Sequence, residues 1–218
     1  MMTEAEIRSA SEQTRARLLE AARETFSQHG FQGATVREIC RRAEANVAAV
    51  NYHFGSKDSL LSEALNFDPL NDMQLANVDA AACPRIRFQL FIHEFMSMLL
   101  DEKKSSSQCR IMARELADPT PALDQIVREA IAPLHEFLGK LIVEVVGEKV
   151  SKAALSRYVN SIMGQCIFYS HSYPVLQRLH PTLRYSQAEI RAIAEHIAEF
   201  SLLALQQISN KPQGGTPC

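Results

Sequence analysis

Apolar side chains recur at helical spacing along almost the whole 218-residue chain. Near the N-terminus, Leu18, Ala22 and Phe26 follow one another in steps of four residues, which places them on one face of an α-helix. The same three- and four-residue steps predict helices over 85–100, from 122 into the 140s, from 151 to about 173, and from 186 to beyond 205. No segment has the strict alternation of a half-buried β-strand, so the predicted fold class is all-α.

Proline and polar residues divide this pattern into two helical domains. Asp68-Pro69 ends the fourth predicted helix, and the following segment, 71–84, has little periodicity and reads as a loop or weak helix. The termini have neither an apolar stripe nor a helix-capping pattern. The predicted division is a flexible arm at 1–11, domains at 12–66 and 67–210, and a disordered tail at 211–218.

Local signals between Phe31 and Leu65 predict two short helices joined by a tight turn. Gly33 breaks the preceding helix, Thr35 is a favourable N-cap, and Glu38 three residues later has the spacing of a capping box. The first short helix then buries Val36, Ile39, Cys40 and Ala43 and leaves Arg37, Arg41 and Arg42 outside.

A second cap, Asn46, follows after a turn of only Glu44-Ala45 and begins a helix over about Val47 to Phe54. Helices joined by so short a connection must cross steeply, as in a helix-turn-helix. In the second helix, Val50 and Phe54 are four residues apart and are predicted to pack inward.

The residue types left on the outer face of this second helix suit recognition of DNA. Asparagine can hydrogen-bond an adenine edge, alanine can contact a thymine methyl group, and tyrosine or histidine can donate to phosphate. Gly55 ends the helix and Ser56 caps the next one, so Lys57, like Thr35, is at a helix start where it can face phosphate. The candidate DNA-binding residues are Thr35, Arg37, Asn46, Val47, Ala48, Asn51, Tyr52, His53 and Lys57. The alternative is a generic helix pair whose arginines form a solvated face.

The order of these residues resembles the DNA-binding domain of TetR-family transcriptional regulators over about 14–65, including its YHF and SKDSL motifs. Two positions depart from the family pattern: Glu44-Ala45 stands where Gly-Val is usual, and Asn51 stands where tyrosine is usual. The base preference therefore does not carry over. A further similarity, over 164–169 (GQCIFY), points to the CecR-type subgroup.

The resemblance implies a homodimer on a palindromic double-stranded DNA operator, formed through the last two long helices. Those helices carry small residues, which let two copies approach closely: Ser161, Gly164 and Ser170 on one, and Ala194, Ala198, Ser201 and Ala204 on the other. The alternative is an ordinary helix pair within one chain.

The resemblance also implies a small-molecule inducer pocket in the second domain. An aromatic and methionine stripe can line such a cavity, with a few polar groups that orient the ligand. The candidate ligand-binding residues are Phe91, Phe95, Met98, Met112, Phe137, Phe168 and Tyr169, with Arg114, His135 and Gln165 as polar groups. The alternative is a plain core, in which methionine and aromatic residues fill gaps.

Composition narrows the function further. The net charge is -2, so the whole-chain basic signature of many nucleic-acid-binding proteins is missing and DNA affinity is expected to depend on presenting a small basic patch twice. The five cysteines and seven histidines have no metal-ligand spacing, and no enzyme constellation appears, so we expect no metal, no cofactor and no catalytic residues. Neither a signal peptide nor a run of about 18 apolar residues occurs, which predicts a cytoplasmic protein without a membrane partner.

We therefore expect a sequence-specific DNA-binding transcriptional regulator. The simplest mechanism is a repressor that leaves its operator when it binds a small apolar or amphipathic ligand. The alternative is a constitutive or partner-controlled DNA-binding helical protein without an inducer.

Overall fold

The computed structural model describes residues 4–65, 70, 73, 82–101, 107–121, 123–147 and 150–209, with the side chains of 4–7, 107–110, 125 and 209 left out. Every regular element within these ranges is a helix, which confirms the all-α prediction. The predicted tail at 211–218 and most of the predicted linker at 71–84 lie outside the described residues.

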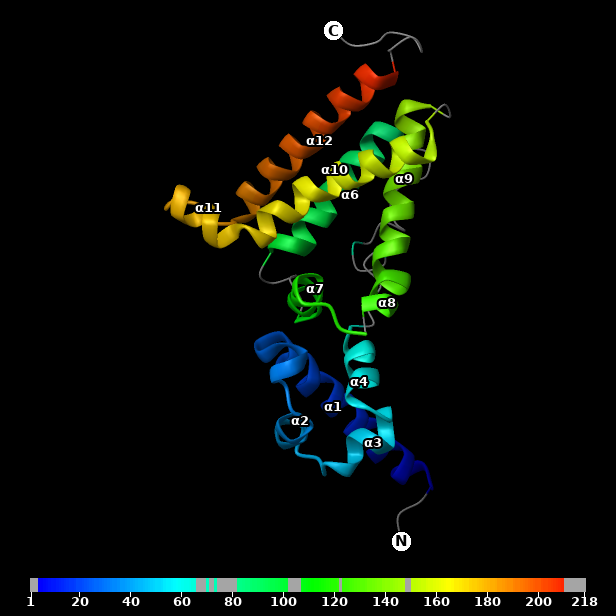
Figure 1. The fold of residues 1–218 in the computed structure, drawn as a ribbon, viewed down its shortest axis with the longest axis vertical. Helices are drawn as coiled ribbons and strands as arrows, with labels where there is room; N and C mark the ends of the chain where they lie inside the picture. The colour runs from blue at the N-terminus through cyan, green and yellow to red at the C-terminus, as the bar shows by residue number, and fades with distance from the viewer. Residues whose placement is uncertain are drawn as a thin grey trace. The chain divides into compact units, whose positions relative to one another are not determined.

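The helices follow one another along the chain as Figure 1 shows. They are α1 (Glu4–Gly33), α2 (Val36–Arg42), α3 (Ala48–Phe54), α4 (Lys57–Ala64), α6 (Pro84–Leu100), α7 (Ser107–Ala117), α8 (Leu123–Ile126), a π-helical turn η2 (Val127–Ile131), α9 (Ala132–Val146), α10 (Lys152–His171), α11 (Tyr173–Leu179) and α12 (Gln187–Ser209). The chain forms two compact units, one of residues 1–67 with 106–131 and the other of residues 68–105 with 132–218.

The N-terminal unit is built on α1, whose Leu18, Ala22 and Phe26 are fully buried as their spacing predicts. Gly30 departs from helical geometry with φ 68° and ψ 178°, and the helix resumes as far as Gly33, where the sequence predicted the break. The predicted arm is wrong for residues 4–11, which are helical. Alanine, glutamate and arginine in this segment have the helix propensity that favours such an extension without an apolar stripe in the sequence.

The core of the N-terminal unit also contains residues from beyond the predicted domain boundary. Ile111 of α7 and Ile126 of α8 are buried in the same cluster as Phe26, Ile39 and Leu60. Arg114 of α7 donates a hydrogen bond of 3.0 Å to the carbonyl of Gln28 in α1. The segment 107–131 is therefore part of the N-terminal core, although 66/67 was the predicted end of that domain.

The C-terminal unit is a packed set of long helices, in which α6, α9, α10 and α12 share one core. α12 packs mainly along α6, and α9 contacts both α6 and α10. Ser151 and Ser186 cap the starts of α10 and α12, since their hydroxyl oxygens accept hydrogen bonds from the backbone N–H groups of Ala154 and Glu189. A π-helical turn immediately precedes α9, whose second residue is Pro133.

Three of the four small residues predicted to dock a second copy on the last helix face inward instead, and only the fourth, Ala204, is exposed. Ala194 and Ala198 are each 2 % exposed and Ser201 is 3 % exposed, because this stripe of α12 packs into the core of its own unit. On α10, in contrast, Ser161 and Gly164 remain exposed. Spacing alone identifies a stripe of small residues but not the helix that covers it.

Candidate nucleic-acid interface and ligand site

α2 begins as predicted, because the Thr35 hydroxyl accepts a hydrogen bond of 3.2 Å from the Glu38 N–H. In a capping box, the Glu38 carboxylate would accept a hydrogen bond from the Thr35 N–H, but here it binds two arginines instead. It accepts two bonds from the Arg41 guanidinium, at 2.8 and 2.7 Å, and one from the Arg42 Nε at 2.9 Å. These two guanidinium groups lower the pKa of Glu38 from 4.5 to about 2.

The arginines of α2 are therefore only partly available to DNA. Arg42 also donates to the Gln28 side chain at 2.8 Å and lies 3.5 Å from a carboxylate oxygen of Glu24. Arg37 is exposed, and within the described residues it has no carboxylate at ion-pair distance. The predicted basic patch is thus reduced, because of the three arginines of α2 only Arg37 has no ion pair within the described residues.

The connection between α2 and α3 is longer than predicted and spans residues 43–47. It turns at Glu44, whose φ of 50° is in the left-handed region. Asn46 then organises the start of α3, since its side-chain oxygen accepts a bond of 2.9 Å from the Ala48 N–H and its carbonyl accepts one of 2.9 Å from Ala49. Asn46 is therefore not the N-cap that the sequence predicted, because α3 begins one residue later than predicted and its N-cap is Val47.

α3 has one buried and one exposed face, as predicted. Val50 is fully buried and Phe54 is 7 % exposed, whereas Tyr52 is 80 % exposed and Val47 is 51 % exposed. Asn51 and Ala48 are also exposed, and His53 is half-buried with its ring 4.8 Å from that of Tyr52. The helix therefore presents an amide, a phenol and small apolar groups on its exposed face, while Val50 and Phe54 pack its other face into the core.

Lys57 has a different environment from the one predicted. Its ammonium group donates a hydrogen bond to the carbonyl of Phe31 and lies 4.2 Å from the centre of the Phe31 ring. Burial lowers the pKa of Lys57, and the nearby Asp58 opposes this effect. Ser56 caps α4 as predicted, by accepting a bond of 3.0 Å from Ser59. The structure thus uses the lysine to hold the end of α1 against the start of α4.

Arg15 of α1 likewise has an internal partner. It forms an ion pair with Glu63, and its guanidinium lies 5.1 Å from the centre of the Phe54 ring. Sequence reasoning missed the positioning roles of Phe31, Glu63 and Glu38. The contacts of Phe31 with Lys57 and of Glu63 with Arg15 join residues far apart in the chain. Glu38 was assigned to a capping box by its spacing from Thr35, which gave no sign of its bonds to Arg41 and Arg42.

Four of the predicted ligand-binding residues lie together between α6 and α9. The Phe91 ring is stacked on those of Phe95, at 5.9 Å, and Phe137, at 5.8 Å, and Met98 packs at the edge of the same core. Phe91 is fully buried and Phe95 is 3 % exposed. This part of the predicted pocket is packed as core.

The other predicted ligand-binding residues are dispersed. Met112 and Arg114 belong to α7 in the N-terminal unit. Phe168 is 52 % exposed, and the Gln165 side chain donates to the Ser161 carbonyl of its own helix at 3.3 Å. The two remaining residues are Tyr169, whose carbonyl accepts a hydrogen bond from Tyr185, and His135, which lies 3.3 Å from the Asn160 side-chain oxygen.

Two surface hollows occur in the C-terminal unit, and one of them includes the predicted ligand-binding residue His135. One of about 550 Å³ lies between α9 and α10 and includes His135, and one of about 540 Å³ lies between α6 and α12. The only local signal for the first was a glycine, Gly139, inside an apolar helix. Within the described residues, no cluster of side chains suits a metal ion, and no helix is long and apolar enough to span a membrane.

Comparison with known proteins decides the family. Residues 84–205 match the C-terminal domain of the HTH-type transcriptional dual regulator CecR, and residues 18–64 match the bacterial regulatory proteins of the tetR family. The chain belongs to the TetR family, in its CecR type. It is a transcriptional regulator and not an enzyme.

Individual relatives of this TetR-family chain agree with that assignment. CecR of Shigella flexneri is 27% identical over 171 residues, which cover 72% of this chain and 76% of that protein. The HTH-type transcriptional repressor AcnR of Corynebacterium glutamicum is 30% identical over 89 residues, which cover 41% of this chain and 42% of that protein. AibR, solved with isovaleryl coenzyme A and operator DNA, shares the fold with a TM-score of 0.64 and 18% identity, over 86% of this chain and 97% of AibR.

Proposed function

We propose that this regulator is a cytoplasmic repressor that binds a palindromic DNA operator as a homodimer. The observation that carries the proposal is the outward face of α3, where Asn51 and Tyr52 are exposed while Val50 and Phe54 are buried. An asparagine can read an adenine edge in the major groove, and a tyrosine hydroxyl can bind phosphate. The names of AcnR, a repressor, and of the AibR complex with operator DNA support this role.

The proposed dimer surface is the outer face of α10 and α12. Large apolar side chains are more than half exposed on both helices, namely Phe168 at 52 %, Phe200 at 59 % and Leu203 at 55 %. A methyl group added to Gly164 on α10 would meet no atom within 4 Å in its own unit, so that surface can accept a close partner. Exposed apolar groups of this size favour burial in an interface.

The proposed signal is a small amphipathic ligand bound by the C-terminal unit. AibR was solved with an acyl coenzyme A, which is an amphipathic molecule of this kind. The ligand would shift the population of dimers away from the arrangement in which both α3 helices fit successive major grooves.

The experiment is selection of bound sequences from a random DNA pool by the full-length protein. We expect an inverted repeat, two protomers per DNA duplex by analytical ultracentrifugation, and an affinity that falls steeply with salt. Isovaleryl coenzyme A and a longer acyl thioester are then added to the complex. Recovery of unrelated sequences would contradict operator recognition, and unchanged binding with both thioesters would contradict control by this ligand class.

A further inference from the structure

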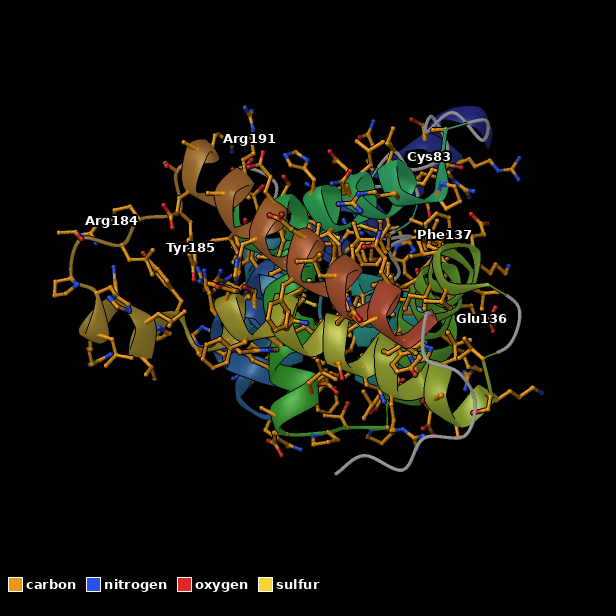
Figure 2. All side chains as sticks on the ribbon, turned by 90° about the horizontal axis from the view of Figure 1, so that it is seen from above. Cys83, Glu136, Phe137, Arg184, Tyr185 and Arg191 are labelled. Atoms are coloured by element: carbon orange, nitrogen blue, oxygen red, sulfur yellow. The ribbon has the colours of Figure 1, made fainter. Side chains whose placement is uncertain are left out.

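The hollow between α9 and α10 has an apolar floor and charged rims. Its floor consists of Gly139 and Val143 on α9 and of Leu155 and Val159 on α10. The volume of about 550 Å³ is within the range of roughly 300–1,000 Å³ that is typical of small-molecule sites. This hollow is separate from the aromatic core, because Phe137 stacks on Phe91 of α6 whereas its neighbour Glu136 lines the hollow (Figure 2).

Gly139 keeps the floor open without being required by packing. A Cβ atom at this position would lie 3.8 Å from Leu155 Cδ2 and 3.9 Å from Val159 Cγ2, which are ordinary van der Waals distances. An alanine would therefore fit and would also favour the helix, since glycine is among the least favourable residues inside one. The absence of a side chain at Gly139 widens the space between α9 and α10.

The rims supply positive charge from both walls. Lys140 on α9 and Lys152 on α10 line the hollow, and within the described residues neither has a carboxylate at ion-pair distance. Glu144, on the same wall as Lys140, is paired with Arg87 at 2.6 Å, which leaves Glu136 as the opposing charge. The sequence contains no acidic residue at all between positions 149 and 188, so α10 contributes only cations.

A polar contact between α9 and α10 lies at the end of this site that includes His135. His135 Nε2 lies 3.3 Å from Asn160 Oδ1, which joins α9 to α10 away from the turn where Lys152 is located. An elongated ligand can therefore place its apolar part along the floor while its charged end stays near the lysines. Lysine side chains reach such a group while their methylene stems cover the apolar surface.

We infer that this groove between α9 and α10 binds a single-chain amphiphile of the fatty-acid class. Its alkyl chain lies on Gly139, Leu155 and Val159, and Lys140 and Lys152 bind its carboxylate through charge-assisted hydrogen bonds. A regulatory role for this binding rests on the proposed function, in which a small amphipathic ligand controls operator binding. The binding itself is independent of DNA.

The test is isothermal titration calorimetry of the full-length protein with decanoate and with decanol, which have the same chain but different head groups. Replacing both lysines (Lys140→Gln with Lys152→Gln) is expected to weaken decanoate about five- to tenfold and to leave decanol unchanged. Gly139→Ala is expected to weaken both ligands while raising the melting temperature. Arg191→Gln is the matched control, because Arg191 lines the other hollow, on α12 (Figure 2).

Three outcomes would overturn the inference: no heat with millimolar decanoate, equal loss of decanoate and decanol in the double lysine variant, or loss caused by Arg191→Gln instead. An increase in sedimentation coefficient with Gly139→Ala and unchanged ligand affinity would also overturn it, because the groove would then belong to a contact between copies. Binding of decanoate that leaves operator affinity unchanged supports the groove and contradicts the proposed control of DNA binding.

Discussion

The ammonium nitrogen of Lys57 lies 4.2 Å from the centre of the Phe31 ring and donates a hydrogen bond to the backbone carbonyl of the same residue. This pair joins the last turn of α1 to the first turn of α4, on either side of the two helices that form the candidate DNA-binding motif. A lysine that was predicted to face phosphate is thereby a positioning residue of the N-terminal unit.

Lys57→Met retains the methylene stem and removes the hydrogen bond and the cation–π contact. We expect the free energy of unfolding to fall by about 1 kcal/mol, measured by urea denaturation. The salt dependence of operator binding is expected to stay as in the wild type, because the charge is engaged internally. A slope lower by about one unit per half-site with unchanged stability would instead support the phosphate contact.

Asn51→Ala and Tyr52→Ala are expected to weaken operator binding by about 1–3 kcal/mol each, because both side chains are exposed on α3. Their melting temperatures are expected to stay close to that of the wild type. Val50→Ala is the contrasting variant, since Val50 is fully buried and its truncation should lower stability by about 2 kcal/mol. Wild-type operator affinity in both surface variants would mean that another face reads the DNA.

The Glu38 carboxylate makes stability depend on acid pH. Its pKa is lowered from 4.5 in the unfolded chain to about 2 by Arg41 and Arg42, so its contribution is complete above pH 4.5 and is lost as the pH falls toward 2. Glu38→Gln is expected to flatten that part of the stability curve, measured by thermal denaturation between pH 2 and 5. An identical curve for both proteins would show that these bonds contribute nothing in solution.

Phe200→Glu is expected to produce a folded monomer with weakened operator binding, because it places a charge in the proposed dimer surface. Ala198→Glu is expected to lower the melting temperature of the protomer itself, since Ala198 is 2 % exposed within its own core. Analytical ultracentrifugation and thermal denaturation separate the two effects. A dimeric Phe200→Glu protein would place the interface on another surface.

A fragment of residues 1–66 is expected not to unfold cooperatively, because it lacks Ile111 and Ile126, which complete the N-terminal core. In the full-length protein, Ile111→Ala should cost about 2–5 kcal/mol in the stability of this unit. Hydrogen exchange of the α1 and α4 amides measures the loss directly. Cooperative melting of the fragment alone would show that α7 and α8 are dispensable.

Helix caps and the two faces of a helix could be predicted from the amino-acid sequence, because the residues that form them lie only a few positions apart. Thr35 and Ser56 were recognisable as caps because a capping oxygen binds an N–H group three residues further along the chain. The two faces of α3 followed for the same reason, since the helical repeat places Val50 and Phe54 together.

Only the tertiary structure decided which surface each side chain meets. Periodicity shows that a stripe is buried but not what covers it, so Ala194 and Ala198 of α12 were predicted to face a second copy although they pack into their own unit. Lys57 and Phe31 are 26 positions apart, and Ile111 joins a core built mainly by residues before 66. Such contacts arise from chain folding at long sequence separation, where no local spacing specifies the partner.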